Sequence, residues 1–191
     1  AVIHPGAQIG AECRIGPYCV IGEHVVLGDR CQLHSHVVID GHTELGAENE
    51  IFPFASIGLK TQDLKWKGGT TRTVIGNNNT FREYVTIHSA TSDGEVTTVG
   101  SHNHILAYCH LAHNVTLGNR IIMSNVATLA GHVTVEDQAV IGGLRAVHQF
   151  CRVGRMAIIG RASWLTLSGA SSWRSMSPGE TLRTSAMLSK P

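Results

Sequence analysis

The chain has 191 residues, and its 15 basic and 14 acidic side chains leave a formal net charge of +1, which gives no reason to expect nucleic acid or an anionic membrane as a partner. With 21 glycines and only 5% aromatic residues, its core must be built from many small aliphatic contacts. No apolar run approaches the roughly 18 residues of a transmembrane helix, and the opening AVIHPGAQIG lacks the pattern of a secretion signal, so no membrane insertion is expected.

An aliphatic side chain recurs every six residues through most of the chain, and glycine often follows it. The first run extends from Ile3 to Ile57, the second from Ile75 to Ile87, and the third from Val99 to Leu165. A period of six does not fit an α-helix, whereas three short strands with their turns make a triangular coil of about 18 residues. The pattern predicts an all-β fold, a parallel β-helix of hexapeptide repeats with about eight triangular coils.

A second column of small or β-branched residues stands four positions after each aliphatic, and all five cysteines fall in it. The thiols are therefore predicted to be buried small hydrophobes and not catalytic groups. The number is odd and no C-x-x-C pair occurs, which favours free thiols in a reducing compartment. We expect a cytoplasmic protein.

The hexad frame breaks twice before it ends, at about residues 59–73 and again at about 89–98. Both segments are polar and contain glycine, so they are predicted to protrude from the prism as loops, and insertions into a solenoid usually cluster on a binding face. The β-helix domain is expected to span residues 1–165. Residues 166–191 show no apolar period and are expected to form an irregular tail.

Residues one coil apart become vertical neighbours, and this places His113, Gly131 and Gln149 in one column with His132 and His148 beside it. A neutral imidazole is a suitable general base at cytoplasmic pH, and His113 could take a proton from a hydroxyl that attacks a thioester. The N–H of Gly131 could then stabilise the oxyanion. The alternative interpretation is that these histidines are hydrogen-bonded corner residues on a solvated face.

Three stretches carry a family resemblance: CHLAHNVTLGN (109–119), NVATLAGHVTVED (125–137) and IGGLRAVHQFCRVG (141–154). They resemble the UDP-N-acetylglucosamine O-acyltransferases of lipid A biosynthesis, and HSHVVIDGHTELG (34–46) and REYVTIH (82–88) extend the resemblance to about residues 1–160. It implies that the β-helix is left-handed. It also implies a homotrimer that moves an (R)-3-hydroxyacyl chain from acyl carrier protein to the 3-hydroxyl of UDP-N-acetylglucosamine, without metal or other cofactor.

The resemblance also assigns roles to residues, with His113 as the general base and the Gly131 amide as the oxyanion donor. His132 and His148 would line the site, and Gln149 would contact the substrate phosphate. The full set of substrate-binding residues that it implies is Gln62, Asp63, Lys65, His88, His110, His132, His148 and Gln149.

Three features depart from the family pattern. Asn114 stands where many members have an aspartate beside the base, and Arg161 stands at the position that limits acyl length, which predicts a preference for short chains. The chain after about residue 160 does not resemble the helical domain of the family. A catalytically impaired trimeric scaffold that binds a nucleotide sugar or carrier protein is therefore the alternative function.

A metal-dependent hydratase is a further alternative on this fold, because γ-class carbonic anhydrases bind zinc with three histidines at a subunit interface. The nearest candidates for such ligands are His102, His104, His110 and His113. No His-x₄-His pair of the kind used in that family occurs. A metal site is not expected.

Overall fold

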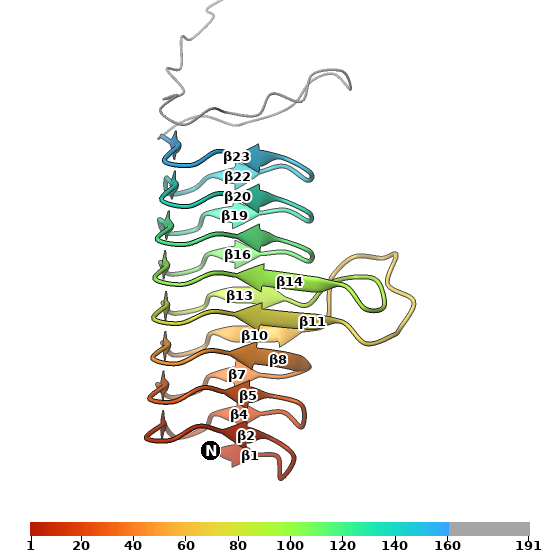
Figure 1. Ribbon diagram of the computed structural model, residues 1–191, viewed down its shortest axis with the longest axis vertical. Helices are drawn as coiled ribbons and strands as arrows, with labels where there is room; N and C mark the ends of the chain where they lie inside the picture. The colour runs from red at the N-terminus through yellow and green to blue at the C-terminus, as the bar shows by residue number, and fades with distance from the viewer. Residues whose placement is uncertain (161–191) are drawn as a thin grey trace, which may run out of the picture.

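The computed structural model describes residues 1–160, which form a straight prism of 24 short strands in three parallel sheets (Figure 1). Sheet A contains β1 (Val2–Ile3), β4 (Val20–Ile21), β7 (Val38–Ile39), β10 (Ser56–Leu59), β13 (Thr86–His88), β16 (His110–Leu111), β19 (Thr128–Leu129) and β22 (Ala146–Val147). Sheet B contains β2 (Gln8–Ile9), β5 (Val26–Leu27), β8 (His42–Leu45), β11 (Arg72–Ile75), β14 (Val96–Val99), β17 (Thr116–Leu117), β20 (Thr134–Val135) and β23 (Arg152–Val153). Sheet C contains β3 (Arg14–Ile15), β6 (Gln32–Leu33), β9 (Glu50–Ile51), β12 (Thr80–Phe81), β15 (His104–Ile105), β18 (Ile122–Met123), β21 (Val140–Ile141) and β24 (Ile158–Ile159).

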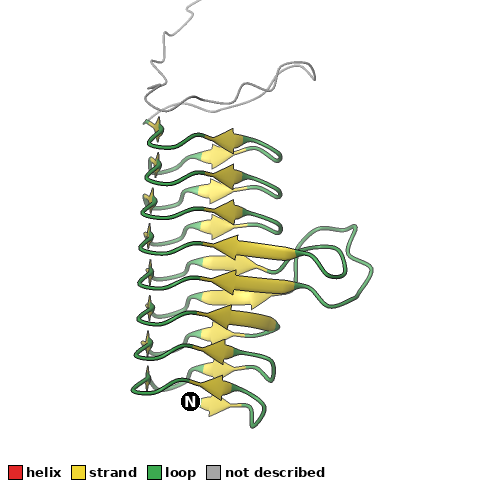
Figure 2. Ribbon diagram, in the orientation of Figure 1, coloured by secondary structure: helices red, strands yellow, loops and turns green. Residues whose placement is uncertain are grey.

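Each sheet takes every third strand, so the chain passes from sheet A to B to C and then begins the next coil. The register follows the hexad frame, since His110 pairs with Thr128 and Leu111 with Leu129. Strands and turns account for the described chain, which contains no helix (Figure 2). The predicted left-handed parallel β-helix of hexapeptide repeats is confirmed, with eight strands in each sheet.

Each hexad forms a two-residue strand and a four-residue corner. In most corners the third residue has a positive φ, as at His36, Asn114 and His132, with values of 61°, 59° and 58°. This conformation costs a residue other than glycine about 1 kcal/mol. The parallel hydrogen bonds between coils offset that cost, and they fix where the neighbouring corner residues point.

Two inward columns fill the prism, and both follow the frame predicted from the sequence. From Cys19 onward, the second residue of the short strands, such as Leu111, and the last residue of the corners, such as Val115, are buried. Four of the five cysteines are buried in the corner column, Cys13 is partly buried, and all five are free thiols. Burial raises the pKa of Cys109 to about 11, so that thiol stays protonated and has little nucleophilic character.

At one corner of the prism the second column is polar, which the aliphatic pattern did not predict. Asn49, Asn79 and Asn103 stack in successive coils with exposures of 1%. The Asn79 amide donates to Asn49 Oδ1 at 2.9 Å and to the Gly100 carbonyl at 3.0 Å, and its Oδ1 accepts from the Asn103 N–H at 2.9 Å. This ladder satisfies buried backbone groups that an aliphatic column would leave without partners.

Both frame breaks form loops on the same side of the prism (Figure 1). Loop 1 covers residues 60–71, between β10 and β11, and loop 2 covers residues 89–95, between β13 and β14. Both are shorter than the predicted 59–73 and 89–98, because β11 and β14 extend to four residues and pair with each other over that length. The loops also contact one another, since the Thr70 N–H donates to Asp93 Oδ1 at 2.6 Å.

Candidate functional site

His113 lies in the corner between β16 and β17, on the side of the prism that carries both loops, and is only 6% exposed. The coil that follows it in sequence fixes the backbone on either side. The Ala112 N–H donates to the Leu129 carbonyl at 3.0 Å, and the His113 carbonyl accepts from the His132 N–H at 3.1 Å. The imidazole therefore projects from a rigid part of the β-helix.

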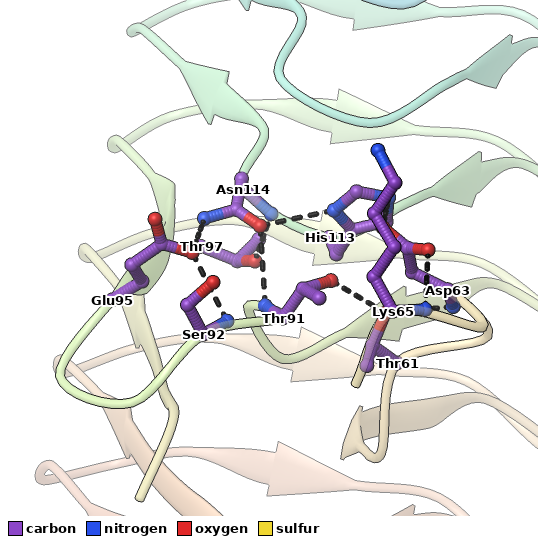
Figure 3. A network of polar contacts seen from close by, with 9 residues as sticks. All are labelled: Thr61, Asp63, Lys65, Thr91, Ser92, Glu95, Thr97, His113 and Asn114. Carbon is purple, nitrogen blue, oxygen red and sulfur yellow. Dashed lines mark hydrogen bonds and ion pairs between the residues drawn. The ribbon is translucent and has the colours of Figure 1, made fainter. Parts of the chain in front are cut away.

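The Asn114 side chain determines which nitrogen of His113 carries the proton (Figure 3). Asn114 Oδ1 lies 2.9 Å from His113 Nδ1 and accepts from the Thr91 N–H at 3.1 Å, while its Nδ2 donates to Glu95 Oε2 at 2.8 Å. A backbone donor and a carboxylate acceptor thus fix the orientation of the amide. Nδ1 must then donate, which leaves the lone pair of the neutral ring on Nε2.

The Nε2 atom of His113 faces Asp63 of loop 1. Asp63 Oδ2 lies 3.6 Å from Nε2, which is longer than a hydrogen bond, and the two side chains are 20% and 8% exposed. A hydroxyl group that approaches this pair would meet a base and a carboxylate acceptor next to each other. Loop 1, which the hexad frame does not place, supplies one half of this arrangement.

Gly131 lies directly against the imidazole ring of His113. A Cβ atom at Gly131 would stand 2.4 Å from both Cε1 and Nε2 of that ring, and the φ of Gly131 is not positive, so space is the reason for the glycine. Within residues 1–160 its N–H donates to no protein acceptor. The predicted column of His113 and Gly131 therefore exists.

Three further histidines surround His113. The His132 ring meets it edge to face with centroids 5.1 Å apart, and the rings of His88 and His110 meet in the same way at 4.9 Å. Burial, followed by the charge of His113, lowers the pKa of both His88 and His132. Burial, followed by the charges of His88 and His113, lowers the pKa of His110 to about 4. These three rings are therefore neutral near pH 7, and they line the site with uncharged polar groups.

Buried hydroxyl groups join the two loops beneath the site. Thr61 Oγ1 accepts from the Asp63 N–H at 3.0 Å and lies 3.0 Å from Thr91 Oγ1, and Thr71 Oγ1 donates to Ser89 Oγ at 3.1 Å. The contacts form a closed circuit from Asp63 through Thr61, Thr91 and Asn114 back to the imidazole (Figure 3). These hydrogen bonds therefore fix loop 1 next to His113.

The remaining predicted residues lie at the rim. Gln62, Lys65, His148 and Gln149 are all exposed. The Lys65 N–H donates to Asp63 Oδ1 at 2.9 Å, and its ammonium group is among the charges that lower the pKa of His132. The His148 ring contacts only the neighbouring Gln149 carbonyl, at 3.4 Å. Arg161, the frame position at Leu165 and the tail at 166–191 lie outside the described residues.

Sequence reasoning missed Glu95, Thr91 and Thr61, which hold the site from behind. All three are loop residues of ordinary polar type, and no spacing in the sequence relates them to His113. The pairing of β11 with β14, together with the hydroxyl contacts between the loops, brings these side chains to the base.

No group of three or more His, Cys, Asp or Glu side chains in the described residues could hold a metal ion. The metal-dependent alternative thus finds no set of ligands within this part of one protomer. Over the same residues, the structure contains no helix long and apolar enough to cross a bilayer.

Comparison with known proteins gives the same fold and the same family. Residues 6–41 match the family described as bacterial transferase hexapeptide (six repeats). An acyl-[acyl-carrier-protein]–UDP-N-acetylglucosamine O-acyltransferase from Synechocystis sp. is 50% identical over 127 residues, which cover 66% of this chain and 46% of the relative. The enzyme of the same name from Verminephrobacter eiseniae is 51% identical over 127 residues, with coverages of 66% and 48%.

Solved structures extend the match. LpxA from Acinetobacter baumannii superposes with a TM-score of 0.84 at 44% identity, over 86% of this chain and 64% of that one. The UDP-N-acetylglucosamine acyltransferase of Francisella novicida gives a TM-score of 0.83 at 43% identity, over 85% and 60%. The matched region spans less than half the length of the curated relatives.

Three observations agree with this similarity: the hexad prism, the His113–Gly131 column and the identity near 50% across 127 residues. Over its hexapeptide-repeat region, this chain is a homologue of the UDP-N-acetylglucosamine O-acyltransferases.

Proposed function

We propose that this chain is an acyltransferase that moves an (R)-3-hydroxyacyl group from acyl carrier protein to the 3-hydroxyl of UDP-N-acetylglucosamine, the first step of lipid A biosynthesis. The observation that carries the proposal is the close approach of both the Asp63 carboxylate and Gly131 to the unprotonated Nε2 of His113. Curated relatives at about half identity bear the name of this activity.

In this mechanism the sugar hydroxyl approaches Nε2 beside the Asp63 carboxylate. His113 takes its proton as the oxygen attacks the thioester carbonyl, and the new C–O bond produces a tetrahedral oxyanion. The Gly131 N–H donates to that oxyanion, and one such donor typically contributes about 3 kcal/mol. The C–S bond then breaks, and the thiolate of the carrier receives the proton held by His113. No cofactor takes part in these steps.

The rim residues fit the two substrates. Lys65 is among the charged groups that act on His132 and is exposed, which suits it to meet a phosphate or a carrier-bound chain. Gln149 and His148 stand one coil beyond Gly131, where Gln149 would contact the sugar nucleotide phosphate. Gln62 is exposed beside Asp63 at the tip of loop 1.

We further propose a homotrimer that packs through sheet A. The outward residues of this sheet carry no formal charge; they are Val2, Val20, Val38, Ser56, Thr86, His110, Thr128 and Ala146. Sheets B and C expose charges at the same position, including Glu44, Arg152 and Arg14. Leu64, at the tip of loop 1, is fully exposed and would be covered by a neighbouring protomer. The free thiols and the near-zero net charge fit a cytoplasmic trimer.

The deciding experiment incubates the purified full chain with UDP-N-acetylglucosamine and (R)-3-hydroxyacyl carrier protein of short and long chain length. Mass spectrometry should detect the O-acylated sugar nucleotide. His113→Ala should lower kcat about 10²–10⁴-fold, the usual contribution of a positioned base. Equal turnover by both proteins would overturn the mechanism, and binding of the nucleotide without turnover would identify the impaired scaffold instead.

Two measurements accompany the assay. Sedimentation equilibrium should give a mass three times that of the chain. Elemental analysis should find no stoichiometric metal, and zinc-dependent turnover would favour the hydratase alternative. The Arg161 hypothesis expects faster transfer of the shorter chains.

A further inference from the structure

Glu95 stands behind the site at the end of loop 2, one residue before β14, and is half-buried. Its Oε2 accepts from Asn114 Nδ2 at 2.8 Å and from the Ser92 N–H at 3.1 Å. These bonds, led by the one from Asn114, lower the pKa of the carboxyl group, so Glu95 is a carboxylate near neutral pH. The acyl-transfer steps proposed above give this half-buried carboxylate no role, although it lies behind the catalytic histidine.

The contacts form a chain of carboxylate, amide and imidazole. Glu95 accepts from the amide nitrogen of Asn114, and the amide oxygen accepts from Nδ1 of His113. An amide has no charge and can be turned end for end. If the Asn114 amide turned, its NH₂ group would face Nδ1 and force the ring proton onto Nε2, where a base needs a lone pair.

We propose that Glu95 is the positioning residue for His113: it holds the Asn114 oxygen toward Nδ1 and places a negative charge one side chain behind the imidazole. The amide alone fixes a tautomer but cannot stabilise the imidazolium that forms when His113 accepts a proton, and the Glu95 carboxylate can. This inference rests on the proposed acyl transfer for its catalytic consequence, but the tautomer can be observed without any reaction.

Two other groups share the task of holding Asn114. The Thr91 N–H donates to Asn114 Oδ1, and the backbone N–H of Asn114 donates to Thr97 Oγ1 at 2.8 Å. The Thr91 bond favours the same orientation as Glu95, so loss of the carboxylate should weaken the arrangement without abolishing it. Charge and orientation are therefore separable by substitution, because a glutamine retains the acceptor oxygen and an alanine retains neither property.

The decisive variants move the negative charge from position 95 to position 114. Asn114→Asp alone would set a second carboxylate at hydrogen-bond distance from Glu95, where like charges repel. Glu95→Gln alone removes the charge. In the double variant, the carboxylate at position 114 accepts directly from Nδ1 of His113. The glutamine at position 95 then donates its amide N–H to that carboxylate. The two defects should therefore cancel.

The expected results follow from this geometry. Glu95→Gln should lower kcat/KM several-fold and keep the Nδ1–H tautomer of His113, whereas Glu95→Ala should lower it about tenfold or more and give a mixture of tautomers. Asn114→Asp should lose more activity than the double variant, which should return to within a few-fold of the wild type. Glu48→Gln, which removes an exposed carboxylate paired with Arg30 in a distant corner, is the matched control and should change nothing.

Long-range ¹H–¹⁵N correlation spectra of the histidine rings report the tautomer, with the His113 signals identified by their loss in His113→Gln. The pH profile of kcat/KM is recorded for each variant, and thermal unfolding confirms that all of them fold. The other titratable groups around His113 stay unchanged across the series; they are Asp63, Lys65 (Figure 3), His88, His110 and His132.

Two outcomes would overturn the inference. One is a Glu95→Ala protein that keeps a pure Nδ1–H tautomer and the wild-type pH profile. The other is a double variant no more active than Asn114→Asp, since a merely structural role for Glu95 would make the defects accumulate. If the wild type shows no acyl transfer at all, the proposed function fails, and the tautomer in Glu95→Ala alone decides whether Glu95 positions His113.

Discussion

His113 and Gly131 touch although no hydrogen bond joins them, since the imidazole occupies the place where a side chain at 131 would be. A methyl group there would lie 2.4 Å from Cε1 and from Nε2, far inside van der Waals contact. Gly131→Ala should therefore displace the ring and lower kcat by about 10²-fold or more, because a misplaced base loses much of its contribution. Steady-state kinetics with both substrates measures the effect.

A matched control separates displacement of the base from general damage to the repeat. Gly143 occupies the same slot of its hexad at another corner, and a methyl group there would meet the Asn125 carbonyl oxygen at 3.2 Å and Ser124 Cβ at an ordinary 3.8 Å. Gly143→Ala should keep activity within a few-fold. Full activity in Gly131→Ala would show that the ring can move without consequence and would remove His113 from the mechanism.

Thr61 should connect the stability of loop 1 with substrate binding. Its hydroxyl accepts from the Asp63 N–H and meets the Thr91 hydroxyl. Thr61→Val leaves that buried amide without an acceptor, at a cost of about 1–3 kcal/mol. We expect a higher KM for the sugar nucleotide with a smaller change in kcat, and faster hydrogen exchange across residues 60–71.

The control for this prediction is Thr116→Val, at an exposed position in β17. It should leave both KM and exchange unchanged. Unaltered exchange in loop 1 of Thr61→Val would mean that the contacts between the loops do not hold Asp63 in place.

The parts of this molecule that could be predicted are those that the repeat controls. Each hexad has the same length, so counting along the chain places His113 beside Gly131 and predicts both inward columns. Asp63 and Glu95 escape this reasoning, because each lies in a segment that leaves the frame and returns through side-chain contacts. Asp63 is held through the hydroxyl pair of Thr61 and Thr91, and Glu95 is held by the Asn114 amide. Such contacts leave no periodic signal in the sequence.

The asparagine ladder was missed for a related reason. A search for apolar periodicity passes over a polar residue that occupies an inward slot. Asn79 fills such a slot and satisfies backbone groups of Gly100 and Asn103. Asn79→Ala should therefore lower the free energy of unfolding by about 2–4 kcal/mol, because it leaves several buried groups unpaired. Urea denaturation at fixed protein concentration measures the difference.

Asn125→Ala provides the comparison. That side chain is exposed and makes no hydrogen bond in the described part of the chain, so its loss should cost less than about 0.5 kcal/mol. A similar small cost at Asn79 would mean that water replaces the ladder.

His110 should make the protein less stable in mild acid. Its pKa is about 4 in the folded state because the ring is partly buried, beside His88 and His113, with Nδ1 2.7 Å from Thr86 Oγ1. In the unfolded chain histidine titrates near 6.5. As the pH falls from about 6.5 to about 4, the unfolded state binds a proton that the folded state does not, and the free energy of unfolding decreases by up to about 3 kcal/mol.

The lowered pKa of His88 adds a loss of the same sign, so the wild type should weaken steadily across this interval. His110→Asn should flatten the decline, because the group that takes up the proton in the unfolded state is gone. His102→Asn is the control: this residue is exposed at a corner with φ of 61°, which asparagine tolerates, and the wild-type decline should persist. Denaturant unfolding at a series of pH values tests both variants, and equal slopes for wild type and His110→Asn would show that the buried ring is not what opposes protonation of the folded state.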